Sequence, residues 1–306
     1  MRKRTQLRFG GYGPATTCFS LALKRIGDAL EARFADDIEV KYVWNIMDLG
    51  YRSEDILWLV ESGVLSLGYQ SSSYLADRVP ELGLVDLPFM FRDKAHARSA
   101  MDGALGSALA TAIEARCDYR ILGWLENGFR HISNRRRQIR TPADLAGLSI
   151  RVLPSEVHVA TFAALGAVPL KWDLTEALAA IAAGTIDAQE NPLANTVTYG
   201  AHKFHPFHTL TGHFYISRPI FMHRAAYDAL PAPIQSALRA AVADAVVHQR
   251  AAAEQEEIEA AAAIRSVGAE LVTLTPAEQR QFMAAVEPLK AKALACYAPD
   301  LVRLVQ

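Results

Sequence analysis

The chain has 306 residues, of which 51% are apolar, and this is enough for two domains of ordinary size with their own hydrophobic cores. Its formal net charge of −1 excludes the broad basic field with which proteins hold nucleic acid, so no nucleic-acid partner is expected. No stretch approaches the roughly 20 apolar residues that a membrane-spanning helix needs.

The N-terminus and the cysteines leave the compartment open. Met1–Arg4 has the positive charge of a secretory signal, but no apolar segment follows it. From these residues alone, the chain is either cytoplasmic or has a leader that was removed or missed. Cys18, Cys117 and Cys296 are odd in number and far apart, so they form no metal-site spacing and at least one lies outside any internal disulfide.

The first part of the chain alternates strands and helices. A strand at 7–9 precedes a helix at 16–35, whose apolar residues recur at helical spacing. An alternating strand at 38–44 follows, then a helix at 53–63 and a third strand at 64–69. This order is typical of a parallel α/β unit.

The second part repeats the same order. It predicts a short helix capped by Thr141, strands at 148–153, 168–170 and 185–188, and helices at 156–165 and 173–184. Two such units indicate mostly parallel sheets with helices on both faces, arranged as two lobes. Ligands bind sheets of this kind at the carboxyl ends of the strands.

The pattern changes after residue 205. Thr209–His223 is long, extended and aromatic, and a nearly unbroken helix is predicted over 233–266. At about 1.5 Å per residue that helix would be roughly 50 Å long, so we expect it to cross both lobes and tie them together. A last helix begins at Thr275, and Pro288 is expected to kink or divide it.

Arg151 interrupts the apolar run from Leu148 to Leu153, which otherwise reads as a buried strand. A guanidinium stays charged, and burying it unpaired costs on the order of several kcal/mol. The nearest acid, Glu156, lies beyond the end of the strand. Either an anionic ligand supplies the negative charge, held by the planar fork next to a helix N-terminus, or a remote acid forms a structural ion pair.

Five motifs carry a family resemblance, and they are Trp124–His131, Ile139–Arg151, Ala164–Ala167, Gly184–Pro192 and Thr211–His213. Gln70–Tyr74 and Asp86–Phe89 extend the likeness upstream, so it covers essentially the whole chain. In order and spacing, the sequence resembles the DctP-type solute-binding proteins of TRAP (tripartite ATP-independent periplasmic) transporters.

The resemblance implies a two-lobed α/β fold of the type II periplasmic-binding-protein kind, with a long helix spanning both lobes. Residues 1–123 and 212–250 would form the N-terminal lobe and residues 124–211 and 251–306 the C-terminal lobe, with the ligand cleft between them. The protein would be a periplasmic, monomeric receptor that captures a small organic acid and delivers it to a TRAP membrane permease for secondary active uptake. It would not be an enzyme and would need no cofactor or metal.

Position by position, Arg151 matches the arginine that clamps the ligand carboxylate in this family, and Asn191 matches a pocket asparagine. Arg130 matches a second arginine that lies near other polar groups of the ligand in a subset of members; bracing of the arginine-rich turn remains the alternative. Two positions depart from the family pattern. Ala188 replaces a glycine, and Leu178 stands where a tyrosine is common.

Further ligand contacts are expected at predicted strand ends. Trp172 would pack on the carbon skeleton of the ligand or belong to the core of its lobe. In the first lobe, Tyr12, Gln70, Ser72 and Phe89 lie in segments that end strands facing the same cleft. Loop position and the family likeness are the basis of these assignments.

Four histidines lie close together in sequence, at 202, 205, 208 and 213, and would suit a zinc ion. Pro206 breaks any helix that could present them on one face, and no cysteine is near. We therefore favour histidines of a loop or hinge over a metal receptor, with His213 as the one facing the cleft and binding ligand.

Catalytic motifs are missing from the sequence: it has no nucleophile elbow, phosphate loop, zinc-protease helix or dinucleotide fingerprint. An enzyme of the two-lobed α/β type acting on a small carboxylic acid remains the alternative function. Arg151 would then bind substrate, with Glu190, Asp187 or a cleft histidine as the base. These two acids are also the candidates for an internal ion-pair partner of Arg151.

Overall fold

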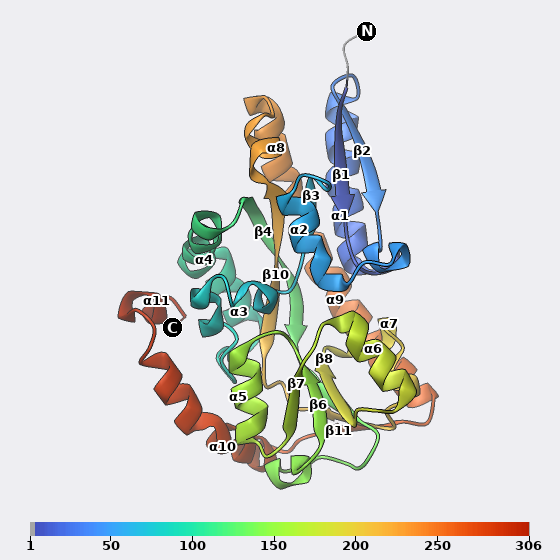
Figure 1. Cartoon of the computed structure of the whole chain (residues 1–306), viewed down its shortest axis with the longest axis vertical. Coiled ribbons are helices and arrows are strands. Elements are labelled where there is room, and N and C mark those ends of the chain that lie inside the picture. Colours follow the sequence, from blue (N-terminus) through green and yellow to red (C-terminus); the bar gives the residue numbers. More distant parts are fainter. Residues whose placement is uncertain (1–3, 306) are drawn as a thin grey trace. The chain divides into compact units, whose positions relative to one another are not determined.

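The computed structural model describes residues 4–305, which contain a five-stranded and a six-stranded β-sheet flanked by helices (Figure 1). The chain divides into two compact units. Unit 1 contains the chain up to Ser71, Ala110–Glu126 and Ser217–Glu254, and unit 2 contains Ser72–Leu109, Asn127–Ile216 and the chain from Gln255 onward. The predicted α/β class is confirmed.

The sheet of unit 1 has the strand order β2-β1-β3-β10-β4. Its strands are β1 (Thr5–Gly10), β2 (Ile38–Val43), β3 (Leu67–Tyr69), β4 (Tyr119–Phe129) and β10 (Tyr215–His223). β1 runs parallel to β2 and β3, whereas β10 runs antiparallel to β3. The sheet is therefore mixed rather than parallel throughout, because the chain returns from unit 2 through β10.

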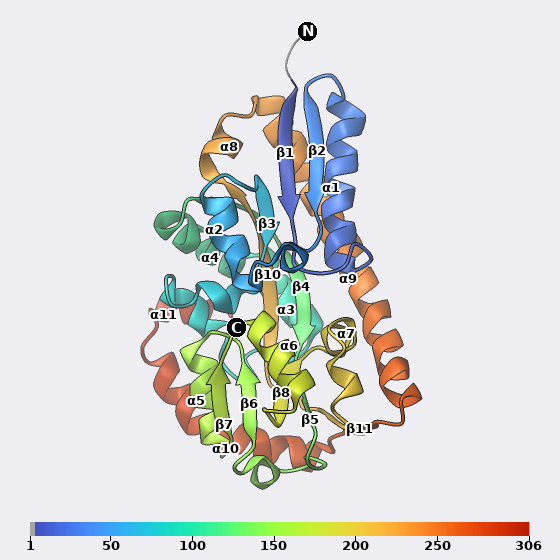
Figure 2. The same cartoon turned by 45° about the vertical axis from the view of Figure 1, so that its right-hand side comes forward.

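Helix α1 (Cys18–Phe34) packs against β2 (Figure 2). It begins at Thr17, whose side chain accepts a hydrogen bond from the backbone N–H of Ser20. The side chains that it turns toward the sheet, which include those of Leu23 and Ile26, are fully buried. Gly27 permits the close approach, since a Cβ at this position would collide with the hydroxyl of Tyr42.

The sheet of unit 2 has the order β11-β9-β5-β8-β6-β7. Its strands are β5 (His131–Asn134), β6 (Ser149–Val152), β7 (Val168–Lys171), β8 (Ala188–Asn191), β9 (Phe207–Leu210) and β11 (Glu270–Thr273). β6 lies between β7 and β8 and is parallel to both, while β5 is antiparallel to β8 and β9. The carboxyl ends of β6, β7 and β8 therefore meet at one edge of this sheet.

Several helices belong to unit 2. They are α5 (Glu156–Ala164), α6 (Leu174–Ala183), α7 (Leu193–Thr198), α10 (Pro276–Leu294), α11 (Pro299–Arg303) and α3 (Lys94–Asp102). α5 packs against β7 and α10 (Figure 2). The buried core on this side of the sheet includes Ile150, Val152, Phe162 and Phe214.

The remaining helices are α2 (Ile56–Glu61), α4 (Ala104–Arg116), α8 (Arg224–Asp228) and α9 (Ala232–Ser266). The long helix predicted from the sequence is α9, whose 35 residues belong partly to unit 1 and partly to unit 2. No helix among residues 4–305 is both long and apolar enough to cross a membrane.

Three local expectations differ from the structure. The strand predicted at 185–188 lies three residues later, as β8, because Gly184 ends α6 in a left-handed conformation and the N–H of Thr185 still bonds to Ala180. Helix α10 continues through Pro288 instead of being divided there. Residues 72–109, which we assigned to the N-terminal lobe, have their contacts in unit 2; the predicted lobe boundaries otherwise stay a prediction.

A buried glutamine of α9 fastens three elements of unit 1. Gln249 accepts a hydrogen bond from the N–H of Glu126 over 3.0 Å and donates one to the carbonyl of the same residue over 2.8 Å. Its amide nitrogen also lies 3.4 Å from the sulfur of Cys18. One side chain thus connects α9 with the backbone of β4 and with the first turn of α1.

We expect Gln249→Leu to lower the free energy of unfolding by about 2–3 kcal/mol, because it removes two hydrogen bonds to buried backbone groups while keeping the side-chain volume. Urea unfolding measures the change. Gln255→Leu is the matched control: it lies on the same helix but is exposed, so its effect should stay within about 0.5 kcal/mol. Equal effects of the two substitutions would contradict this assignment.

Candidate functional site

Arg151 lies on β6 and is buried, with 1% of its surface exposed. Its Nε donates a hydrogen bond to the carbonyl of Trp172 over 2.9 Å, and its Nη2 donates to the hydroxyl of Tyr74 over 3.0 Å. It forms no ion pair with any residue between 4 and 305. A cation is therefore held inside unit 2 by two neutral oxygen atoms.

The two acids that the sequence offered as internal partners of Arg151 bind other residues. Glu190 forms an ion pair with Arg130. Asp187 accepts hydrogen bonds from the N–H and the hydroxyl of Ser149 and pairs with Arg136. The structural reading, in which Arg151 has an acid of its own, finds no support in these contacts.

The contacts of Arg151 leave one edge of its guanidinium open. A guanidinium can hold a carboxylate either on the edge formed by Nε and Nη2 or on the edge formed by Nη1 and Nη2. The protein uses Nε, which donates to the carbonyl of Trp172, and one of the two N–H groups of Nη2, which donates to the hydroxyl of Tyr74. No residue in the described part of the chain accepts a hydrogen bond from Nη1, so the guanidinium keeps donors on Nη1 and Nη2 that an anion can use.

The strand register places the predicted residues on one face of the sheet. Arg151 on β6 lies beside Gln189 on β8, and side chains of paired residues in a parallel sheet point the same way. Asn191, two residues further along β8, shares that face. Trp172 follows directly after the end of β7. Three of the predicted ligand contacts thus gather at the carboxyl ends of neighbouring strands.

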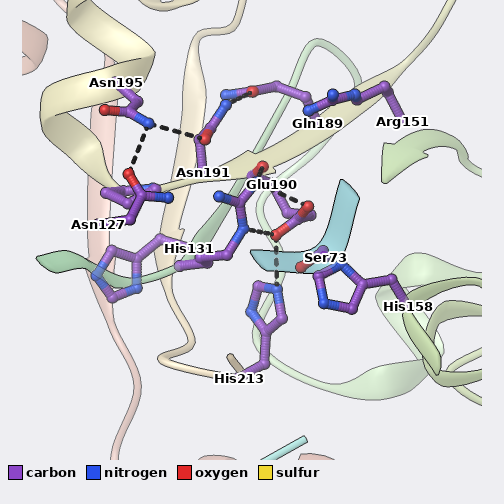
Figure 3. A network of polar contacts seen from close by, with 12 residues as sticks. Ser73, Asn127, His131, Arg151, His158, Gln189, Glu190, Asn191, Asn195 and His213 are labelled. Carbon is purple, nitrogen blue, oxygen red and sulfur yellow. Dashed lines mark hydrogen bonds and ion pairs between the residues drawn. The ribbon is translucent and has the colours of Figure 1, made fainter. Parts of the chain in front are cut away.

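Asn191 belongs to a chain of carboxamide groups (Figure 3). Its Nδ2 donates to Gln189 over 2.9 Å, and its Oδ1 accepts a longer hydrogen bond from Asn195. Asn195 also donates to Asn127 over 3.0 Å. These bonds fix the orientation of the Asn191 amide at the end of β8; its contact with a ligand stays a prediction.

Arg130, which directly precedes β5, has its charge neutralised by Glu190, a residue of β8 that Figure 3 shows beside His213. Its Nη2 donates to the Glu190 carboxylate over 2.9 Å and to the backbone carbonyl of the same residue, and its Nε also bonds to the carboxylate. His213 Nε2 lies 3.4 Å from Glu190. Burial would raise the pKa of Glu190, but the charge of Arg130 and the bonds from His213 and Arg130 outweigh it and hold the pKa well below its ordinary value. A ligand contact of Arg130 stays a prediction.

A second buried acid, Asp86, lies near Arg130, Glu190 and His213 and forms no ion pair with an arginine or lysine among residues 4–305. It accepts a hydrogen bond from Ser73 over 2.7 Å and lies 3.7 Å from His158, which stacks on Phe214. Burial raises the pKa of Asp86 to about 6 and lowers the pKa of His158 to about 3. The sequence shows the Asp86–Phe89 motif but gives no sign that this carboxyl is buried.

Two predicted contacts, Tyr12 and Gln70, lie in unit 1 at the ends of β1 and β3. Both are buried, and Gln70 donates to the carbonyl of Ser53 over 2.9 Å. Beside them lies a residue that sequence reasoning missed. The guanidinium of Arg218 on β10 is 3.9 Å from the ring centre of Phe19 and 5.2 Å from that of Tyr12. The sequence could have indicated Arg218, because it is an arginine within an apolar strand, which is the feature that identified Arg151.

Three further candidates lie in unit 2. Ser72 is fully buried. Phe89 is partly buried, with a positive φ of 49° and a backbone N–H that donates to the carbonyl of His213. The ring of Trp172 packs on a small cluster that includes Ile181. Their roles in ligand binding stay predictions.

The histidines at 202, 205, 208 and 213 each contact an oxygen atom of the protein through one ring nitrogen. His205 contacts the hydroxyl of Ser133 over 2.9 Å, and His208 contacts the carbonyl of His205 over 2.8 Å. Residues 4–305 contain no grouping of three or more histidine, cysteine or acidic side chains that could hold a metal ion. Of the four histidines, only His213 contacts Glu190.

Comparison with known proteins identifies the family. The profile of the DctP family, described as bacterial extracellular solute-binding protein, family 7, matches residues 9–295. The chain belongs to this family. Its members include solute-binding proteins of TRAP transporters, and the resemblance read from the sequence is confirmed.

Named relatives agree with this assignment. The 2,3-diketo-L-gulonate-binding periplasmic protein of Escherichia coli is 31% identical over 269 residues, which cover 87% of this chain and 80% of the relative. The sugar acid binding protein of Advenella mimigardefordensis, solved in complex with galactonate, has a TM-score of 0.93 and 26% identity, covering 99% of this chain and 97% of that chain. A TRAP periplasmic solute binding protein of Polaromonas bound to D-erythronate has a TM-score of 0.92 and 27% identity, covering 99% of this chain and 98% of that chain. The two-lobed α/β fold is thus confirmed.

Buried histidines give the protein a predicted dependence of stability on pH. Burial lowers the pKa of His131, His158 and His205 to about 3 and that of His208 to about 4, from an ordinary value of 6.5. They stay neutral in the folded protein but bind protons in the unfolded chain below pH 6.5. Asp86 has the opposite sign, because its folded pKa of about 6 exceeds its ordinary value of 3.8.

We therefore expect the free energy of unfolding to fall as the pH is lowered from neutral toward 4. Each histidine removes up to about 1.4 kcal/mol per pH unit, and the single opposing group, Asp86, offsets only one of the four. Urea unfolding at about pH 7, 5.5 and 4.5 measures the trend. Stability that rises on acidification over this range would contradict the assignment.

The substitution Asp86→Asn tests separately how Asp86 contributes to the dependence of stability on pH. It removes a buried charge but keeps an oxygen that can accept from Ser73, so it should raise the free energy of unfolding near pH 7 by about 2–4 kcal/mol. The gain should vanish toward pH 4, where the aspartate is protonated in the folded protein. Asp36→Asn, at an exposed position, is the control and should show no such pH-dependent difference.

Proposed function

We propose that this protein is the receptor of a TRAP transporter, that it captures a small organic acid by docking the carboxylate on Arg151, and that it delivers the acid to a membrane permease. The observation that carries the proposal is the buried Arg151, which has two neutral hydrogen-bond partners and no ion pair among residues 4–305. A carboxylate supplies the charge that the cation lacks. Periplasmic localisation follows from the same assignment.

The docking geometry follows from the open edge of the guanidinium. A carboxylate that accepts hydrogen bonds from Nη1 and Nη2 lies in the plane of the Arg151 guanidinium. Asn191 shares the face of Arg151, where its carboxamide offers both a donor and an acceptor to polar groups next to the carboxylate. The pairing strengthens as water is excluded from the site.

The ligand class that we propose is a hydroxylated acid with one carboxylate. Relatives or structural neighbours bind galactonate, D-erythronate and 2,3-diketo-L-gulonate, according to their names. Within unit 2, Arg130 provides no second open cation, since Glu190 neutralises it. Carboxamide groups along the same face suit hydroxyl groups, which also donate and accept.

Enclosure of the acid by both lobes, as the resemblance implies, stays part of the proposal, as does a monomeric state. A decrease in the radius of gyration on addition of ligand, measured by small-angle scattering, would support closure. The alternative of an enzyme has no observation in its favour, because the family and fold are those of solute-binding proteins. Recovery of the bound acid unchanged after prolonged incubation separates a receptor from an enzyme.

A thermal-shift screen of organic acids comes first, since a ligand that binds only the native state raises the Tm. With the acid so identified, we expect Arg151→Ala to weaken binding by about 2–5 kcal/mol, or roughly 30- to 5,000-fold in Kd, because a buried charged pair is lost. Arg151→Lys keeps the charge but not the fork, so it should also bind weakly.

Titration calorimetry measures these affinities. Arg136→Ala is the control, since its side chain is exposed and pairs with Asp187 rather than lying in the site. Near-normal affinity in Arg151→Ala would disprove docking on this residue.

A further inference from the structure

The geometry assigns a tuning role to Tyr74 and Asp173: we propose that they form an indirect counterion which holds the buried Arg151 ready for ligand and competes with the ligand for its charge. This inference rests on the proposed function, in which Arg151 binds the carboxylate. Neither residue is among the contacts that the sequence indicated, and both belong to unit 2.

The hydroxyl of Tyr74 connects three groups. It accepts hydrogen bonds from Arg151 Nη2 over 3.0 Å and from the backbone N–H of Leu174 over 3.2 Å. It donates to Asp173 Oδ2 over 3.4 Å. The negative charge of Asp173 thus reaches the guanidinium through one neutral phenol rather than through a direct contact.

Asp173 is fixed in this place by the helix that it begins. It is the N-cap of α6, where its Oδ1 accepts the N–H of Thr175 over 2.8 Å. It is also buried, with 2% of its surface exposed. A carboxylate held by a helix N-terminus and a phenol cannot swing freely onto Arg151.

An indirect counterion answers two opposed demands on the site. A buried cation needs negative charge nearby, and even beyond ion-pair distance a carboxylate in a medium of low dielectric lowers the penalty of burial. A direct ion pair would occupy the fork that the ligand needs, as Glu190 occupies that of Arg130. Tyr74 keeps Asp173 close enough to stabilise the empty site while leaving the Nη1 and Nη2 edge open.

The arrangement predicts effects of opposite sign for the two residues. Once a ligand carboxylate docks, two negative charges share one arginine, so Asp173 repels the ligand. Loss of this charge should therefore tighten binding. Loss of the Tyr74 hydroxyl should weaken binding, because it releases Nη2 and lets Asp173 approach Arg151 and compete for the fork.

Calorimetry with D-galactonate as the probe tests this; if galactonate gives no thermal shift, the acid with the largest shift in the screen replaces it. We expect Tyr74→Phe to raise the Kd about 10-fold and Asp173→Asn, which keeps the N-cap, to lower it about 3- to 10-fold. In the double variant, most of the loss caused by Tyr74→Phe should be recovered. Without ligand, Asp173→Asn should lower the Tm, so that affinity and stability move in opposite directions.

Matched controls exist for both substitutions. Tyr119→Phe removes a hydroxyl that donates to the carbonyl of Leu57, and Asp93→Asn changes the N-cap of α3. Both should alter stability only. Unchanged affinity in Tyr74→Phe, or weaker binding in Asp173→Asn, overturns the indirect counterion. The proposed function still stands in that case if Arg151→Ala binds the probe acid much more weakly than the unchanged protein does. Normal binding by Arg151→Ala instead overturns the proposed function itself.

Discussion

The candidate site of unit 2 depends on a buried guanidinium that has no direct counterion among the residues that the structure describes. Arg151 and Arg130 are equally buried, each with 1% exposure, yet their surroundings differ in charge. Arg130 is neutralised by an ion pair with Glu190, whereas Arg151 is held by a carbonyl and a phenol. The difference between the two arginines therefore lies in the groups that the protein places beside them. Arg130 is part of an internal ion pair, whereas Arg151 is available to an anion.

The sheet keeps these two environments apart. Successive side chains of a strand point to opposite faces, so along β8 Gln189 and Asn191 share a face with Arg151 while Glu190 points into the core with Arg130. A shift of one residue in β8 would exchange the carboxylate and the carboxamides. It would place Glu190 beside Arg151 and close the site. The register of this short strand is thus what keeps the binding cation open.

Much of this arrangement follows from local sequence rules, and the rest depends on contacts between distant segments. An arginine inside an apolar strand identified Arg151, and the same rule applied to β10 would have found Arg218. Helix caps and the long helix α9 were also predictable, because their signals lie within a few residues. The Tyr74–Asp173 contact joins residues 99 apart, and no periodicity reports such a pairing. The strand β8 was misplaced because the turn after Gly184 extends the helix cap.

The segment between β7 and α6 shows how few residues a tunable site requires. Trp172 gives its carbonyl to Arg151, Asp173 gives its charge through Tyr74, and Leu174 gives its N–H to the same phenol. Backbone groups supply two of the three interactions, so the arrangement depends on side-chain identity only at Asp173 and Tyr74. Changes at these two positions can adjust the affinity for an anion without altering the strand that presents Arg151. The affinity for an anion can therefore be adjusted while the fold is kept, and one scaffold can serve a range of acids.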